Sequence, residues 1–460
     1  MPSSFGSINT ALTALYAQRK GLDVTGQNIA NANTPGYTRQ RVEMQSQVGS
    51  TSSAMYATTE GPGTGVGVTD VQRMRDQYLE DRGRTEHANQ AYLTSQSSAY
   101  ASIEDVFSEP SDTALQAQMH DMWDAWSDVA NNPQLASARS ALIQQSSTVA
   151  DGLNSAHQSL TSQWGQNRSS LDAYVDQVNT AAQTIAQLND SIVKAKASGS
   201  VHNELEDQRD QAVQQLAELT GASASIRPNG AMDVFVGGLS LVSGFTTRKM
   251  EIVGAKRLDD QAVDPMTLRW SDTGSAVEAG GTMGAMVDTL TTIIPQISSA
   301  LDGVAANLIA TVNAAHNAGF SIDGSTGLDF FNGTDAGTIK VAITDPAQVA
   351  MSSTAGALDN TVADTLAATG SSPTGPDSEY QTMIGQLGVA AQASGRRSEI
   401  QNTVTEQVDA AREAQSGVNL DEEMTNLLTY QRGYEAASRV LTTIDSMLDQ
   451  LINRTGLVGR

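Results

Sequence analysis

Three short motifs in this sequence have residue types and spacing that could support chemistry. The run GPGTGVG at residues 61–67 has the glycine content of a loop that cradles a dinucleotide. Ser191 and Lys194 have the S-x-x-K spacing of serine acyl-transfer enzymes. The third motif alternates like part of a calcium-binding loop: Asp323, Ser325, Gly327 and Asp329. Each motif can act only if the element that carries it presents its side chains correctly.

The elements around these motifs do not favour catalysis or ligand binding. No apolar strand precedes residues 61–67, so a flexible connector is the better interpretation. Ser191 and Lys194 lie within a long amphipathic helical pattern, and the companion motifs S-D-N and K-T-G are missing from the sequence. In the acidic loop, Thr334 stands where a calcium loop would place its closing glutamate. We therefore predict no enzyme activity, no cofactor and no metal site.

Histidine and cysteine usage supports the same prediction. The sequence has no cysteine, which excludes disulfides, thiolate metal sites and cysteine nucleophiles. The five histidines are scattered without ligand spacing, and packing or surface roles are favoured for all of them: His87, His120, His157, His202 and His316.

Length and charge exclude further classes. A chain of 460 residues can form two or more domains with a substantial core. Its 27 basic and 51 acidic residues give a net charge of −24, which argues against binding to nucleic acid. No apolar run approaches the roughly 20 residues that span a bilayer, and residues 1–10 lack the features of a signal peptide. We expect neither membrane insertion nor a cleaved leader.

The first forty residues predict a helix that must end in a turn. Apolar residues from Ile8 recur at helical spacing, with Ser7 as a candidate N-cap. Pro35 and Gly36 then force the chain to stop and turn within the segment 21–42. Such a narrow stripe is marginal alone and needs a partner surface.

The middle of the chain predicts long helices followed by short strands. Residues 65–71 alternate apolar and small residues like a short strand. Residues 72–220 are predicted as helix, broken near 109–111 and 131–133. One near-heptad seam extends over about fifty residues, a rod of roughly 75 Å: Leu142, Val149, Leu153, Leu160, Trp164, Leu171, Val175, Val178, Ala182, Ile185 and Ile192. A hairpin at 224–236 and short strands to 270 follow, then a helix at 283–318 and a short strand at 339–343.

The C-terminal part predicts a turn-rich stretch and two more helices. Small and turn residues dominate 364–374, and a helix begins near Tyr380. The last helix has Asn419 as N-cap and Glu422 at capping-box spacing. The first 42 residues carry four basic and one acidic residue, whereas 406–460 carry nine acidic and five basic residues, which favours pairing of the two ends.

These patterns predict a mainly α protein with a smaller β part. The expected architecture is an elongated long-helix bundle with a coiled-coil-like pair of terminal helices and an inserted region of short strands. We expect three units: a terminal assembly domain of 1–50 with 410–460, a bundle of 51–220 with 281–318 and 380–409, and a β-rich region of 221–280 with 319–360. The ends, about 1–50 and 410–460, are predicted to be mobile in the isolated chain.

Several stretches resemble the axial proteins of the bacterial flagellum. The run NIANANTPGY at residues 28–37 is similar to their N-terminal signature, and SGVNLDEE at 416–423, followed by Leu427, Tyr430 and Tyr434, is similar to their C-terminal helix. Interior stretches resemble the first hook-associated proteins, the FlgK family, over essentially the full length: DQRD at 207–210, FVGG at 235–238, GG at 280–281, NAAH at 313–316 and DFF at 329–331.

The resemblance implies a structural subunit at the junction between hook and filament. It implies partners as well: further copies in a helical ring, the hook subunit, the next junction protein toward the filament, and a FlgN-type chaperone on the last helix. It also implies an extracellular location reached through the flagellar type III apparatus. The expected assembly interface comprises Leu12, Leu15, Leu22, Asn28, Ile29, Asn31, Asn33, Pro35, Gly36, Tyr37, Met424, Leu427, Tyr434, Leu441, Ile444, Leu448 and Leu451.

Two points qualify the resemblance. Many family members carry a large β insertion after the DFF stretch, whereas Asp345 and Pro346 follow here within about fifteen residues, so a slim outer surface is expected. The alternative is another axial protein, a hook or rod subunit, which would share the ends but should lack the long seam at 138–197 and the helix at 207–210.

Overall fold

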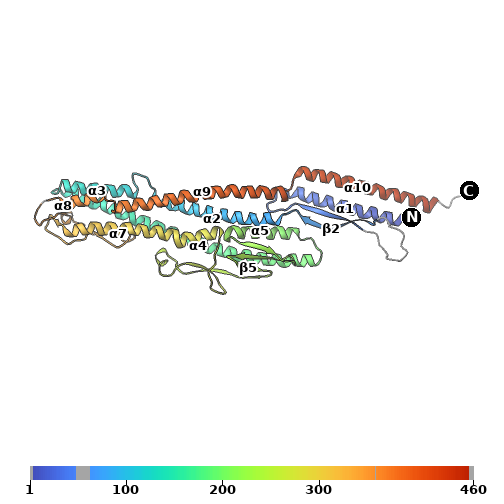
Figure 1. Cartoon of the computed structure of the whole chain (residues 1–460), viewed down its shortest axis with the longest axis horizontal. Coiled ribbons are helices and arrows are strands. Elements are labelled where there is room, and N and C mark those ends of the chain that lie inside the picture. Colours follow the sequence, from blue (N-terminus) through green and yellow to red (C-terminus); the bar gives the residue numbers. More distant parts are fainter. Residues whose placement is uncertain (1–3, 48–62, 358, 455–460) are drawn as a thin grey trace.

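The computed structural model describes residues 4–47, 63–357 and 359–454. It is an elongated molecule in which a pair of terminal helices extends from one end of a rod of long helices (Figure 1). Short strands cover one side of the rod. The mainly α fold with a smaller β part is as predicted.

The terminal pair consists of α1 (Ser4–Ala30) and α10 (Leu420–Asp449), which lie side by side and continue into a π-helical turn, Gln450–Arg454. A ribbon of two antiparallel strands, β1 (Gln40–Gln47) and β2 (Gly65–Arg73), packs against α1. The predicted N-cap Ser7 is wrong, because the helix already includes Ser4. β2 confirms the strand expected near residue 65, whereas β1 was not predicted. The glycine run at 61–67 lies partly outside the described residues.

The rod is built from α2 (Gln77–Phe107), α3 (Leu115–Asn131), α4 (Ala136–Ala197), α5 (Asn203–Thr220), α6 (Gly281–Asp288), α7 (Ile294–Ala318), α8 (Thr361–Thr369) and α9 (Pro376–Ser416). A π-helical turn, Thr289–Ile293, joins α6 to α7. The predicted breaks near 109–111 and 131–133 are confirmed.

Three predicted boundaries in the rod are wrong. The helix expected near Gln72 begins at Gln77, because β2 extends to Arg73 and Asp76 caps α2 by accepting from two backbone N–H groups. The stretch 364–374 was predicted as turn, but α8 occupies its first half because its few apolar residues pack inward. The helix expected near Tyr380 begins earlier, at Pro376, whose fixed φ suits a first helical turn.

The predicted seam of α4 forms the centre of the rod. All eleven seam residues are buried, and α4 spans 62 residues, about 93 Å at 1.5 Å per residue. Trp164 is fully buried, and its Nε1 donates to the carbonyl oxygen of Leu290 in the π-helical turn at 2.8 Å. Burial of a large apolar side chain stabilises a fold by about 1.5–3 kcal/mol, so this seam holds the rod together.

The β region lies along α4 as several small sheets. The largest has the order β3 (Ser223–Ile226), β4 (Met232–Val236), β5 (Leu239–Ser243) and β6 (Thr246–Thr247), and contains the predicted hairpin. The two-stranded sheets pair β7 (Met250–Val253) with β8 (Thr267–Trp270), β9 (Phe320–Ser321) with β12 (Ala350–Ser352), and β10 (Phe331–Asn332) with β11 (Lys340–Val341).

Asparagine side chains attach these strands to the helices. Asn189 and Asn179 of α4 each donate to and accept from strand backbone, at Met232 and Met250 respectively. Asn313 of α7 makes the equivalent contacts with the stretch before and within β10. The outer strands are therefore in fixed register with the rod.

One helical stretch within the described residues, Gly281–Ala318, is long and apolar enough to cross a membrane by length and composition alone. Helices at the centre of a protein meet the same criterion. In this fold its apolar face packs into the rod, where Leu301, Val304 and Leu308 are fully buried.

Candidate functional site

The terminal helices contact each other mainly through small residues. Ala11, Ala17 and Val24 of α1 and Ala437 of α10 are the buried apolar residues of the pair. A methyl group on Gly21 would lie 2.7 Å from the ring of Tyr430, so the helices cross closely here.

The predicted apolar interface is only partly covered. Eight of its residues are half-buried: Leu12, Leu15, Leu22, Ile29, Leu427, Leu441, Ile444 and Leu448. Met424 and Leu451 are 51% and 56% exposed, and Tyr434 is 36% exposed. Further apolar residues of this end were not predicted and are at least half exposed: Leu420, Leu428, Val440, Met447 and Ile452. The single chain thus leaves a large apolar surface on α10 facing solvent.

Asn28 organises a buried polar cluster between α1, β1 and α10. Its Nδ2 donates to the carbonyl of Gln40 at 2.8 Å and to the carboxylate of Glu423 at 3.0 Å. Its Oδ1 accepts from the Tyr37 hydroxyl at 2.8 Å and from the Gln40 N–H at 3.0 Å. Burial, and then the nearby carboxylates, raise the pKa of Tyr37 well above its usual range, so the hydroxyl remains a donor. Asn28 and Tyr37, both predicted as interface residues, therefore act inside one chain.

The remaining predicted residues of the turn lie closer to the surface. The Asn31 side chain donates to the Gln27 carbonyl at 3.0 Å and accepts from Thr34. Asn33, Pro35 and Gly36 are exposed, and Gly36 has a φ of +79°, which only glycine adopts readily. The turn is thus fixed at its base and open at its tip.

Sequence reasoning missed the arginine that joins the two ends of the chain. Arg39 contacts Glu422 at 2.7 Å and Glu423 at 2.7 Å, and the Glu423 side chain is 2% exposed. Burial acts to lower the pKa of Arg39, but the hydrogen bonds to both carboxylates outweigh it and raise the pKa. The excess of basic residues near the N-terminus was the one sequence signal for this contact.

The start of α10 shows why Glu422 takes part. Asn419 caps the helix as predicted, accepting from the N–H groups of Asp421 and Glu422 at 2.9 and 3.3 Å. The Glu422 carboxylate, predicted to complete a capping box, bonds to Arg39 instead.

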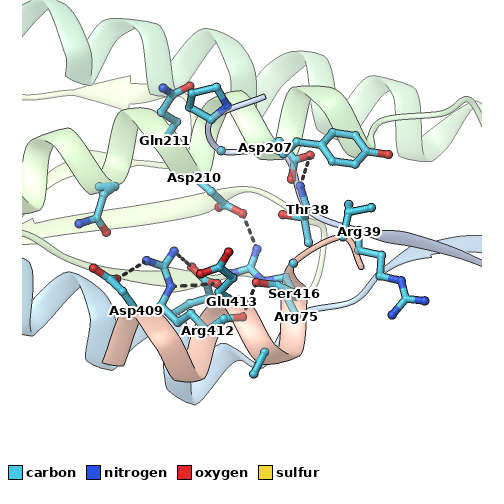
Figure 2. Close-up of a pocket in the computed structure, with 18 of the residues that line it drawn as sticks. Thr38, Arg39, Arg75, Asp207, Asp210, Gln211, Asp409, Arg412, Glu413 and Ser416 are labelled. Carbon is cyan, nitrogen blue, oxygen red and sulfur yellow. Dashed lines mark hydrogen bonds and ion pairs between the residues drawn. The ribbon is translucent and has the colours of Figure 1, made fainter. Parts of the chain in front are cut away.

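A second ionic cluster joins the ribbon to α5. Arg73, 6% exposed, contacts Glu206, Asp207 and Asp210 at 2.7–2.8 Å, and Arg75 contacts Asp210 at 2.5 Å. Asp207 also accepts from the backbone N–H of Thr38 at 3.3 Å (Figure 2). Burial acts to lower the pKa of Arg73, but the three carboxylates outweigh it and raise the pKa, so Arg73 stays charged.

A groove of about 1180 Å³ lies between this cluster and the end of α9. Its charged side chains are mostly paired: Arg412 contacts Glu80 at 2.9 Å, and His87 contacts Asp409 at 2.9 Å. No group of three metal-ligating side chains occurs in the part of the chain that the structure describes. The ion pairs in the groove therefore join neighbouring helices to one another.

The sequence motifs weighed for chemistry fall on other surfaces. The Ser191 hydroxyl donates to a carbonyl of its own helix, and Lys194 pairs with Asp190 on the exposed face. Asp323 accepts from neighbours in its own loop. Among the histidines, His316 is buried, and burial lowers its pKa. Each of these side chains is engaged locally.

The mobility predicted for the ends of the isolated chain stays a prediction. Within residues 4–47 and 410–454, both terminal helices are formed and paired. The ribbon beside them is bound to α5 of the rod. The polar clusters supply the additional contacts, and hydrophobic periodicity gives no sign of them.

Family models match three parts of the sequence. Residues 100–331 match the flagellar hook-associated protein FlgK helical domain. Residues 8–38 match the flagella basal body rod protein family, and residues 412–454 match the flagellar basal body rod FlgEFG protein C-terminal family. The terminal segments and the rod thus match separate models.

Similar proteins cover the whole chain. Flagellar hook-associated protein 1 of Bacillus subtilis is 30% identical over 100% of both chains. The Escherichia coli protein of the same name is 27% identical, over 97% of this chain and 99% of its own. The solved flagellar hook junction protein FlgK of Burkholderia pseudomallei has a TM-score of 0.62 at 15% identity, covering 72% of this chain and 99% of that one. This last likeness concerns the fold.

Proposed function

Because this chain belongs to the flagellar hook-associated protein 1 family and is a structural subunit of the hook–filament junction, we propose that it assembles there through α1 and α10. The apolar face of α10 carries this proposal. Its exposed residues are too many for a helix that, within the described residues, packs mainly against α1, and surfaces of this kind mark interaction sites. The predicted interface residues are assigned to this contact, and Asn28 and Tyr37 among them also hold the turn in place inside one chain.

The proposed partners are those that would cover the two terminal helices. Further copies in a helical ring, the hook subunit and the next junction protein toward the filament would cover α1 and α10. We also propose that an export chaperone of the FlgN type covers the α10 stripe before export through the flagellar type III apparatus. The protein would then act outside the cell, without catalysis and without a cofactor.

The unit boundaries are part of the proposal. The assembly domain comprises residues 1–50 with 410–460, the bundle comprises 51–220 with 281–318 and 380–409, and the β-rich region comprises 221–280 with 319–360. The break between α9 and α10 at Ser416 supports the first boundary. The terminal models are named for rod proteins, but the match over residues 100–331 favours the junction over a rod or hook subunit.

Replacement of exposed apolar residues tests this assignment. Met424→Asp with Met447→Asp should abolish incorporation at hook tips and reduce chaperone binding at least tenfold, because both side chains are more than half exposed and would enter the contact. Val263→Asp in the β region, where Val263 is 88% exposed, is the matched control and should assemble normally. Deletion of residues 415–460 should have the same effect while the rod stays folded. Normal hook capping by the double variant would refute the assignment.

A further inference from the structure

We propose that Arg73 and Arg75, bound by the acidic N-terminal half of α5, set the direction of the terminal helix pair relative to the rod. The ribbon of β1 and β2 packs against α1 and belongs to the same unit as the terminal pair. The inference concerns the isolated chain, so it does not rest on assembly at the junction.

The covalent links between the terminal pair and the rod are short and non-helical. Residues 74–76 connect β2 to α2, and residues 417–419 connect α9 to α10. A non-helical link of three residues permits rotation about several φ and ψ angles. These links alone therefore do not fix the direction of the terminal pair relative to the rod. Non-covalent contacts across the junction must do so.

α5 is a rod element that reaches across this junction, as is the end of α9, whose Ser416 carbonyl accepts from the Arg39 N–H at 3.0 Å. The second half of α5 is anchored in the rod core through buried Val213, Leu216 and Ala217. Its first half extends beside the ribbon, where Asn203 donates to the Val71 carbonyl at 2.8 Å. The helix therefore has one end in each unit.

The acidic residues of α5 bind the ribbon at several points. Arg73 places its guanidinium within 2.8 Å of three carboxylates on successive turns of α5. Arg75 adds a fourth contact with Asp210, and the Thr38 N–H donates to Asp207. A planar guanidinium with fixed donors restrains orientation as well as distance.

The burial of these charges makes alternative directions costly. The side chains of Arg73 and Asp207 are 6% and 10% exposed. Rotation of the terminal pair would separate partly buried charges from their partners, and an unpaired buried charge is strongly unfavourable. An apolar contact of the same area would permit sliding, whereas this cluster specifies one geometry.

Spin-label distance measurements can test the direction of the pair. The sequence has no cysteine, so labels can be placed at will. Gln407→Cys on α9 and Glu435→Cys on α10, both exposed, report the angle between rod and pair. Glu435 lies about 22 Å beyond the start of α10, so a tilt of about 20° moves it by roughly 8 Å. The parent protein should give one narrow distance distribution.

Loss of the cluster should broaden that distribution at least twofold. Arg73→Gln with Arg75→Gln, and independently Asp207→Asn with Asp210→Asn, remove the contacts from opposite sides. Arg73→Lys should broaden the distance distribution less than the double variants do, because lysine keeps the positive charge. It should still broaden it somewhat, because one ammonium group cannot reach all three carboxylates. Arg248→Gln, which removes a two-point contact with Asp272 in the β region, is the matched control and should leave the width unchanged.

A second label pair separates direction from folding. Arg19→Cys with Glu435→Cys spans α1 and α10 within the pair and should stay narrow in every variant. An unchanged Gln407–Glu435 distribution in both double variants would overturn the proposal. Equal broadening between α1 and α10 would overturn it too, because the cluster would then hold the pair together rather than aim it.

Discussion

Helices α4 and α10 carry similar apolar seams in sequence, but the two seams differ in how far the structure buries them. Every seam residue of α4 is buried. Met424 and Tyr434 of α10 and Leu451 of the π-helical turn that follows it are exposed, and the rest of this predicted seam is half-buried. Periodicity therefore identifies an apolar face without identifying what covers it. In the rod the chain supplies the cover itself, and at the ends it does not.

The partners of the two helices explain the difference. α4 packs against α3, α5, α7 and the strands, which bring large side chains such as Trp126 and Trp270 into the core. Within the chain α10 packs against α1, whose buried residues are chiefly alanine, valine and glycine. Small residues permit a close approach but remove little apolar area from water, so this contact contributes less stability.

The largest predicted contrast comes from truncating one residue in each helix. Trp164→Ala should lower the free energy of unfolding by about 3–5 kcal/mol, because it opens a cavity and removes the hydrogen bond from the indole to the Leu290 carbonyl. Met447→Ala, at a 57% exposed position, should change it by less than about 0.5 kcal/mol. Urea unfolding followed by circular dichroism measures both. Should Trp164→Ala prevent folding, Trp164→Phe gives a smaller loss of the same sign.

The rod was predictable from sequence where its signals are local. Heptad spacing gave the α4 seam, and Pro110 and Pro133 marked the breaks. α8 was missed because its residues are mostly small, with Val362 and Leu366 as its larger buried side chains. β1 was missed because its buried face carries the polar Gln40 beside Val42, so the apolar alternation that predicts a strand is too short.

The clusters at the junction could not be predicted in the same way. Arg39 and Glu423 are 384 residues apart in sequence, and neither belongs to a periodic pattern. The carboxylates of α5 look like an exposed acidic turn until the ribbon brings Arg73 to them. Pairings of this kind depend on the tertiary fold, so a single sequence gives only the charge contrast between its ends.

A smaller effect is expected on the stability of the rod at low pH, through the buried His316. His316 is 1% exposed, its Nδ1 donates to the Leu328 carbonyl at 2.7 Å, and its Nε2 accepts from the Ala350 N–H at 3.0 Å. Burial lowers its pKa below the unfolded value of 6.5, against the raising effect of Leu328 and Asp329. The unfolded chain therefore binds a proton first as the pH falls, and the rod should lose up to about 1.4 kcal/mol per pH unit below 6.5.

A substitution isolates this contribution from the carboxylates. His316→Gln can donate and accept as the neutral imidazole does, so the difference in unfolding free energy between parent and variant should shrink as the pH falls from 7 to 5. A parent and a His316→Gln variant with parallel profiles would show that His316 does not titrate in this range.

The smallest predicted effect tests the close crossing of the terminal helices. Alanine stabilises a helix interior by roughly 0.5–1 kcal/mol relative to glycine. Gly26→Ala should show this gain, because no atom lies within 4 Å of the new methyl group. Gly21→Ala should instead lose about 1 kcal/mol, since its methyl group would lie 2.7–2.9 Å from three ring atoms of Tyr430 and push the helices apart. Hydrogen exchange of the α1 and α10 amides should then be roughly fivefold faster than in the parent for Gly21→Ala and slower for Gly26→Ala. If both variants slowed exchange, there would be room for a methyl group between α1 and α10, and the close crossing would be refuted. The weaker packing of the terminal pair compared with the rod would then be due only to the small size of its buried side chains.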